Sequence, residues 1–482
     1  MPVDKEIATG DLIETVYEHE LTLPQLGIEF FLPASGDNAY NISCSIKIPD
    51  SLKLNYLVIN DNREPVIIDD KKGETRTYLF EWKTFRHKKN ESAFAEGLNI
   101  PGILAAYPFS PSRKGINSWK EFGSWYLNTI KEKTEADDVI KKKGIEITTG
   151  LKTDLEKMNA IFNYCQNNVR YEQVYLAKGE FIPNQCSLIL SRKYGDCKDY
   201  ATLIYALAKS AGIKTELVLC YRGRGERRFY DIPVSQFNHA IVHFNYEGND
   251  YWYDGTNRSG TPGITTTDLI NQTSLVLEEN DSHLQLIKEN TDNRLSITGT
   301  LTNNLNDLNG DIKIQLNSQY AVDFLYIDFM LDKVKMDAYL TRWLRETLND
   351  MIEIKEIKWS KEDHNFTINV TCRIPNSVIK INNASYLSIG KMFSNLMPHM
   401  DDGDAEKEIF YYPGYSNIMI DLLVDNLTDN LSKSSKGFRL KYDYKMNPGP
   451  YSENERDIFI KSFRSISGDI NLKYKLMNIG ML

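Results

Sequence analysis

One cysteine of this chain stands where a thiol could serve as a nucleophile. Residues 194–200 read YGDCKDY and open a segment whose apolar residues follow helical spacing. Gly195 allows a tight turn, and Asp196 is a residue type that caps helix N-termini. Cys197 would then lie in the first turn of the helix, where unpaired N–H groups and the helix dipole stabilise a thiolate. The position alone also fits a small apolar residue that packs at a helix start, so both interpretations stay open.

A nucleophilic cysteine needs a base, and usually a third group that orients the base. The chain has seven histidines. Two of them, His239 and His243, share one face of a predicted strand at 238–244, which reads NHAIVHF. Both are candidates for the base, and both also fit ordinary histidines at a strand surface.

An aspartate at the end of the next predicted strand, 251–254, could orient the base. The turn residues Gly248-Asn249 predict a hairpin between the two strands, with residues 244 and 253 opposite each other. Asp254 would then lie near one of the two histidines, where it could fix the imidazole tautomer by accepting its N–H. The spacing does not choose between them.

The other cysteines do not form a recognisable framework. They are irregularly spaced and contain no CxxC pair: Cys44, Cys165, Cys186, Cys220 and Cys372. This pattern argues against a disulfide scaffold and against a structural zinc site. Two histidines with one cysteine lack a further ligand at suitable spacing, so we expect no metal and no other cofactor.

The elements that would position these residues follow two periodicities. Alternation with a period of two predicts strands in the first ~113 residues and again from residue 295 onward, where a turn is expected at Asn309-Gly310. Helical spacing dominates between them, and antiparallel strands follow it. Predicted helices begin at Ser118 and Thr153 and cover 197–210, 338–351 and 453–463, and the clearest strands are 42–48, 78–82, 215–221, 238–246, 250–254, 366–372 and 438–444.

Three segments, in this order, resemble the transglutaminase-like superfamily. They are GDCKDYATLIYALAKSAGIKTELVL (195–219), NHAIVHF (238–244) and YWYDGTN (251–257). In that family the cysteine at the helix start, the histidine after asparagine and the aspartate before a small residue and threonine form a triad. The resemblance therefore implies Cys197, His239 and Asp254, and it selects His239 over His243.

The resemblance also implies an architecture. The chain resembles a bacterial subfamily that is common in Bacteroidetes. Members of this subfamily have an N-terminal β-sandwich, an α+β papain- or transglutaminase-like core and a β-rich C-terminal domain with helices. The expected domains are residues 1–113, 114–285 and 286–482. The first of them is expected to be truncated.

The implied activity is cysteine acyl transfer through a thioester, on a protein or peptide substrate. Water as the acceptor would give a peptidase or amidase, and a lysine amine would give protein crosslinking. The oxyanion would be held by the Cys197 N–H and a second donor among Tyr171, Gln173 and Gln185. The rival interpretation is a retired enzyme that binds partners through its β domains. The oligomeric state stays open.

Composition limits the remaining classes. The 482 residues are 41% hydrophobic, and the net charge is 57 − 66 = −9, which argues against a general nucleic-acid binder. No apolar run approaches a membrane span. The basic loop 222–228 (RGRGERR) fits either a surface loop or a cleft rim that favours acidic groups. Residues 1–10 do not read as a signal peptide. The resemblance implies an exported, periplasmic protein, and a cytoplasmic one stays open.

Overall fold

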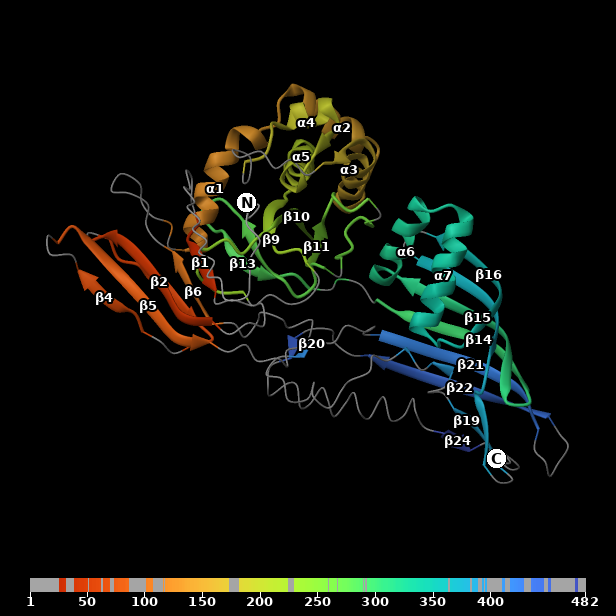
Figure 1. Cartoon of the computed structure of the whole chain (residues 1–482). Coiled ribbons are helices and arrows are strands. Elements are labelled where there is room, and N and C mark those ends of the chain that lie inside the picture. The colour runs from red at the N-terminus through yellow and green to blue at the C-terminus, as the bar shows by residue number, and fades with distance from the viewer. Residues whose placement is uncertain are drawn as a thin grey trace, which may run out of the picture.

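The elements form three groups along the chain in a computed structural model with a mixed α/β fold. In Figure 1 the N-terminal strands lie to the left, a helical layer over a sheet lies in the middle, and the C-terminal strands lie to the right and below. The structure describes residues 26–31, 39–50, 52–61, 64–69, 73–85, 101–106, 116, 118–172, 182–223, 229–258, 260–266, 268–288, 290, 293–362, 365–381, 384–388, 392–393, 395–396, 410–411, 417–428, 435–445, 450–451 and 473–475.

The N-terminal group consists of two three-stranded sheets that share one apolar core. The strands are β1 (Ile28–Phe31), β2 (Ala39–Pro49), β3 (Asn55–Ile59), β4 (Val66–Asp69), β5 (Thr75–Phe85) and β6 (Gly102–Ala106), in the orders β1-β6-β3 and β2-β5-β4. The predicted strands 42–48 and 78–82 are confirmed within β2 and β5. Phe80 and Ile103, one from each sheet, are buried in the same cluster, so the two sheets face each other across it.

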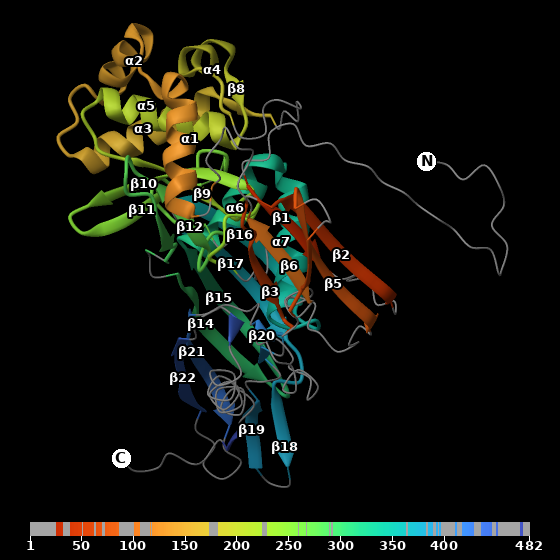
Figure 2. The same cartoon turned by 90° about the vertical axis from the view of Figure 1, so that its left-hand side faces the viewer.

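The middle group places helices on a five-stranded antiparallel sheet. Its helices are α1 (Trp119–Thr134), α2 (Asp138–Thr148), α3 (Asp154–Asn168), α4 (Cys186–Arg192) and α5 (Cys197–Ser210), and its strands are β7 (Arg170–Tyr171), β8 (Tyr194–Gly195), β9 (Glu216–Cys220), β10 (His239–Tyr246), β11 (Asn249–Tyr253), β12 (Thr273–Leu277) and β13 (His283–Leu286). The sheet order is β11-β10-β9-β12-β13, and α5 packs on β9 and β10. Figure 2 shows the same helical layer above these strands from the side.

The predicted register of the hairpin near the site is wrong. The turn is Glu247–Gly248 rather than Gly248-Asn249, and residue 244 pairs with Tyr251 instead of 253. Both turn residues have positive φ, 52° and 80°, as a two-residue hairpin turn of this kind requires. The turn begins one residue earlier than predicted, and this shift moves every pair by two residues along β11. Asp254 therefore follows the end of the strand, one residue beyond the pair formed by Val242 and Tyr253.

The C-terminal group is a six-stranded sheet with two helices and several short strands. Its elements are β14 (Leu295–Asn304), β15 (Asp307–Asn317), α6 (Gln319–Met330), α7 (Lys333–Thr347), β16 (Glu353–Glu362), β17 (Asn365–Ile374), β18 (Val378–Ile381), β19 (Ala384–Ser388), β20 (Phe410–Tyr411), β21 (Asn417–Thr428), β22 (Ser435–Lys445), β23 (Pro450–Tyr451) and β24 (Lys473–Lys475). The large sheet has the order β16-β17-β15-β14-β21-β22. Helices α6 and α7 share its apolar core.

Two sequence predictions fail in this group. The turn expected at Asn309-Gly310 lies instead at Leu305 and Asn306, and Gly310 is inside β15 opposite Leu301. A Cβ on Gly310 would lie 2.2 Å from the Thr300 carbonyl oxygen, so this glycine marks a close approach of two strands. Helix α6 was not predicted, and the predicted helix 338–351 is α7, shifted towards the N-terminus. The predicted helix 453–463 lies outside the described residues.

The groups are joined by direct contacts. The Gly27 N–H donates to the Pro233 carbonyl at 2.9 Å, and Val234 packs in one buried cluster with residues of β3 and β6. The described part of the chain holds seven helices, and none of them is long and apolar enough to cross a membrane. The domain limits 1–113, 114–285 and 286–482 stay a prediction.

Candidate active site

Cys197 is the first residue of α5, as the sequence predicts. Asp196 caps the helix by accepting the Asp199 N–H at 3.4 Å, and the Asp199 side chain accepts the Asp196 N–H in return, which completes a capping box. The helix behind them is almost fully buried. Cys197 itself is half-buried, whereas the other five cysteines are buried. Burial raises the pKa of each of those five thiols, so Cys197 is the accessible thiol of the chain.

The N-terminus of α5 is held in place by a buried carboxylate. The Asp199 side chain is 1% exposed and pairs with the Arg192 guanidinium at 2.6 Å. The same carboxylate accepts the backbone N–H of Asn184 at 2.7 Å. Because these partners come from the α4 segment and the residues before it, the first turn of α5 and the thiol it carries are fixed relative to α4.

His239, the first residue of β10, contacts both of the other predicted residues. Its Nε2 lies 3.0 Å from Asp254 Oδ2, and both side chains are buried. The Cys197 side chain lies close enough to the ring to help raise the pKa of His239. Since Nε2 is taken by Asp254, Nδ1 is the ring nitrogen that remains for the thiol. The structure thus brings together Cys197, His239 and Asp254.

The Asp254 carboxylate is saturated with donors. Its Oδ1 accepts the Thr256 N–H at 3.0 Å and the Thr256 hydroxyl at 2.6 Å. Its Oδ2 lies 3.1 Å from Arg222 Nη1 and 3.0 Å from His239 Nε2. Burial alone would raise the pKa of this carboxyl, but His239, Arg222 and Thr256 together lower it well below its usual range. Asp254 is therefore ionised at every pH at which the protein would work.

The charge of Asp254 sets the protonation of the histidine. Burial by itself lowers the pKa of His239, but the Asp254 charge and hydrogen bond, with the contact to Cys197, raise this pKa to about 9. The ring is therefore an imidazolium at neutral pH. An imidazolium beside a thiol is the arrangement that supports an ion pair with a thiolate.

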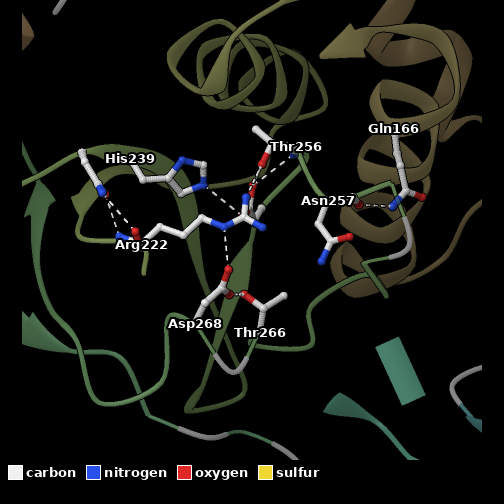
Figure 3. Close-up of polar contacts among 9 residues, drawn as sticks. Gln166, Arg222, His239, Thr256, Asn257, Thr266 and Asp268 are labelled. Atoms are coloured by element: carbon white, nitrogen blue, oxygen red, sulfur yellow. Dashed lines mark hydrogen bonds and ion pairs between the residues drawn. The ribbon is translucent and has the colours of Figure 1, made fainter. Parts of the chain in front are cut away.

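Arg222 is part of this site, whereas the sequence predicts for its basic loop either a place on the surface or a place at the rim of the cleft. Its Nε donates to Asp268 at 2.7 Å and its Nη1 to the Thr256 hydroxyl at 2.8 Å. Figure 3 shows the guanidinium between Asp268 and Thr256, with His239 alongside. The Asn238 Oδ1 accepts the Arg222 backbone N–H at 2.7 Å, and the Asn238 Nδ2 donates to the Arg222 carbonyl at 3.0 Å. Residues 224–228 of the loop lie outside the described residues.

His243, the other candidate base, is held in a separate ion cluster. Its Nδ1 lies 3.0 Å from Glu216, its Nε2 lies 2.9 Å from Asp250, and its ring packs 4.6 Å from Trp252. Burial lowers the pKa of His243, but the two carboxylates outweigh it and raise the pKa overall. Both ring nitrogens are occupied, so this histidine has no nitrogen left to serve as a base.

Replacing His243 by Gln is expected to cost about 2 kcal/mol of stability at pH 6, while thiol chemistry at Cys197 persists. The raised pKa means that His243⁺ stabilises the fold fully below its unfolded value of about 6.5 and loses this effect as the pH rises through its folded pKa. The stability difference between variant and wild type should therefore shrink at alkaline pH. Urea unfolding at pH 6 and pH 9 measures it; an unchanged difference would contradict this assignment.

A cavity of about 570 Å³ opens beside His239. Its lining residues are Tyr171, Arg222, Asn238, His239, Thr256, Asn257, Arg258, Thr266, Asp268, Val322, Asp323 and Tyr326. The last three come from α6, so the C-terminal group supplies one wall of the cavity. Cys197 is not among the lining residues, whereas His239, whose pKa the Cys197 side chain helps to raise, is one of them.

The three candidates for the second oxyanion donor fare differently. Tyr171 lines the cavity, and burial, together with nearby Cys197 and Asp196, raises its pKa to about 12, so its hydroxyl stays protonated and able to donate. Gln185 is an exposed N-cap of α4 and does not line the cavity. Gln173 lies outside the described residues. Among the residues that the structure describes, no group of three His, Cys, Asp or Glu side chains could hold a metal ion.

A comparison with protein-family models finds a match that covers the region of the candidate site. Residues 141–254 match the family model described as the transglutaminase-like superfamily. The matched segment contains α5, β9 and β10 and ends at Asp254. No curated protein matches the chain.

Two solved structures are similar to the chain. One, described as a "putative protease" from Parabacteroides distasonis, shares 12% identity with a TM-score of 0.51, over 94% of this chain and 75% of that chain. The other, described as a "putative cysteine protease" from Cytophaga hutchinsonii, shares 14% identity over 55% of this chain and 86% of that chain. Its TM-score is 0.22, so only the first structure supports a common fold.

Proposed function

Because residues 141–254 form a transglutaminase-like superfamily domain, we propose that the chain is a cysteine acyl-transfer enzyme that cleaves amide bonds of peptides or proteins. The observation that supports this proposal is the position of the His239 ring, whose Nε2 lies 3.0 Å from Asp254 Oδ2 and whose pKa is raised in part by the nearby Cys197 side chain. A buried, oriented imidazolium next to the accessible thiol is the arrangement that nucleophilic catalysis by cysteine requires.

In the proposed first half-reaction, Cys197 Sγ forms a bond to the substrate carbonyl carbon. The thiol proton resides on His239, and the carbonyl π electrons move to the oxygen. The tetrahedral intermediate then breaks its C–N bond, the amine leaves with the proton from His239, and a thioester remains on Cys197. Asp254 holds the ring and keeps its charge compensated throughout, since its carboxylate stays ionised.

The oxyanion of that intermediate needs at least two donors. The backbone N–H of Cys197 lies in the first turn of α5, where N–H groups point away from the helix and have no helical acceptor. The Tyr171 hydroxyl is the favoured second donor, since it lines the cavity and stays protonated. In the second half-reaction, water gives a proton to His239 as its oxygen bonds to the thioester carbonyl carbon. The C–S bond of the tetrahedral intermediate then breaks, which releases the carboxylic acid and restores the Cys197 thiolate beside protonated His239.

Two alternatives share this site. A lysine amine in place of water would make the chain a crosslinking enzyme, and a retired enzyme would bind partners without forming a thioester. Peptide hydrolysis is the version we favour, since water needs no binding site of its own and the cavity is open to solvent.

An assay with β-casein and monodansylcadaverine separates the three. Hydrolysis is expected to produce new casein N-termini without fluorescent casein, because the thioester is passed to water. Fluorescent casein would identify amine transfer instead. If neither product forms and iodoacetamide does not modify Cys197, the enzyme proposal is overturned in favour of the retired form. Cys197→Ala protein is the control for contaminating peptidases.

A further inference from the structure

The charged groups that line the cavity have partners, with one exception. Arg222 pairs with Asp254 and Asp268, and His239 pairs with Asp254. Arg258 also lines the cavity and is exposed. Among the described residues, no carboxylate forms an ion pair or hydrogen bond with it. An unpaired guanidinium in a cavity beside a candidate nucleophile is a binding group for an anion.

The backbone on both sides of Arg258 is anchored. Gln166, from α3, donates through its Nε2 to the carbonyls of Asn257 at 2.7 Å and Gly260 at 2.8 Å. The Gly260 N–H donates to the Asn257 carbonyl at 2.9 Å, which closes a turn around Arg258. Figure 3 shows the Gln166 amide reaching Asn257. The backbone carbonyls of Asn257 and Gly260, on either side of Arg258, are therefore anchored to α3.

The same turn is continuous with the candidate site. Three residues separate Arg258 from Asp254, and one of them, Thr256, forms hydrogen bonds with both the Asp254 carboxylate and Arg222. A group bound by Arg258 thus has a defined position relative to the His239–Asp254 pair. The facing wall is α6, which presents the apolar side chains of Val322 and Tyr326 and the carboxylate of Asp323 to the cavity.

We propose that Arg258 binds a carboxylate of the acyl donor, so that the preferred substrates are peptides with an acidic group near the bond to be cleaved. This inference rests on the proposed function and specifies its substrate class. The planar guanidinium offers paired N–H donors that match the two oxygens of a carboxylate. The carboxylate could belong to an Asp or Glu side chain or to the C-terminus of the peptide, because the chemistry of recognition is the same.

The first test compares two alkylating agents that differ in charge. Iodoacetate is anionic and iodoacetamide is neutral, and both are expected to modify Cys197, the half-buried thiol. The quantity measured is the ratio of the iodoacetate rate constant to the iodoacetamide rate constant. In Arg258→Gln we expect this ratio to fall about three- to tenfold at low salt, and in Arg258→Lys to stay near the wild-type value.

The matched control is Arg342→Gln, which removes an exposed arginine on α7 that does not line the cavity. Its ratio should equal that of the wild type. An unchanged ratio in Arg258→Gln, or an equal fall in Arg342→Gln, would overturn the anion site. Absence of alkylation at Cys197 in all proteins would instead count against the proposed function, so the two failures are distinguishable.

The second test identifies the source of the carboxylate. This test measures how well two pairs of peptides protect Cys197 from alkylation by iodoacetamide. The members of one pair differ by Glu against Gln, and those of the other differ by a free against an amidated C-terminus. The acidic member of one pair should protect Cys197 at lower concentration than its neutral partner, and this preference should vanish in Arg258→Gln. A preference in neither pair, or one that persists in the variant, contradicts the proposal.

Discussion

Asp254→Asn is expected to bring the pKa of His239 from about 9 to below its ordinary value of about 6.5. Two opposing effects act on this ring: burial favours the neutral form, and the Asp254 carboxylate favours the charged form. An amide keeps the shape of the carboxylate and removes its charge, so burial then dominates. Titration of the histidine ring signals by NMR measures the change directly.

The activity of Asp254→Asn should fall about a hundredfold or more at pH 7, because the neutral ring no longer carries the proton that the leaving amine needs. The matched control is Asp250→Asn, which removes a carboxylate from His243 instead. It should lower the pKa of His243 and leave that of His239 in place. If the His239 signal titrates near 9 in Asp254→Asn as well, the assigned electrostatic role is wrong.

The charges of His239 and Asp254 also make the stability of the fold depend on pH. The raised pKa of His239 means that its charge stabilises the fold fully below about pH 6.5 and that this effect is lost as the pH rises through about 9. The lowered pKa of Asp254 means that its charge stabilises the fold above its unfolded value of about 3.9 and loses this effect only in strong acid. The pair thus stabilises the fold most strongly between about pH 4 and 6.5.

Cys197→Ala is expected to lower hydrolysis of a susceptible peptide or ester by about a thousandfold or more, because no thioester can form. The fold should survive, since the side chain is half-buried and Asp196 and Asp199 still cap α5. The matched control is Cys372→Ala, which removes a buried thiol from β17 in the C-terminal group and should keep its activity. Turnover in Cys197→Ala comparable to the wild type would place the reaction elsewhere.

The local sequence predicts the site elements well where the signals are short-range. The cap residue Asp196 and the apolar stripe behind it predict a helix over 197–210, which are the bounds of α5 in the structure. The strand that carries His239 begins within one residue of its predicted start and ends where predicted, at Tyr246. These features depend on neighbouring residues, so one sequence contains enough information for them.

Tertiary contacts decide what the sequence alone leaves open. Spacing does not separate His239 from His243, because the choice depends on Glu216 and Asp250, which occupy both nitrogens of His243. The register of the hairpin differs from the prediction because the two positive-φ positions are Glu247 and Gly248, and a non-glycine residue such as Glu247 gives no sequence signal for the first of them. Arg222 was missed because its partners Asp268 and Thr256 are more than thirty residues away in sequence.

The surroundings of the site could be predicted least. The family resemblance implies Cys197, His239 and Asp254 as site residues. Nothing in the pattern of residues 319–330, however, indicates a helix that lines the same cavity. That helix, α6, has a nearly uniform apolar character rather than one apolar face, so it lacks the periodic signal of a surface helix. Its place beside the core is set by packing against the C-terminal sheet.

The central claim is that Cys197 accepts an acyl group, and trapping the acyl-enzyme tests it most directly. After brief exposure to p-nitrophenyl acetate, intact-mass analysis should find one acetyl group that neutral hydroxylamine removes, and peptide mapping should place it on Cys197. Cys197→Ala should lack it. A hydroxylamine-sensitive acetyl group that persists in Cys197→Ala, or its absence from folded wild-type protein, would contradict the claim.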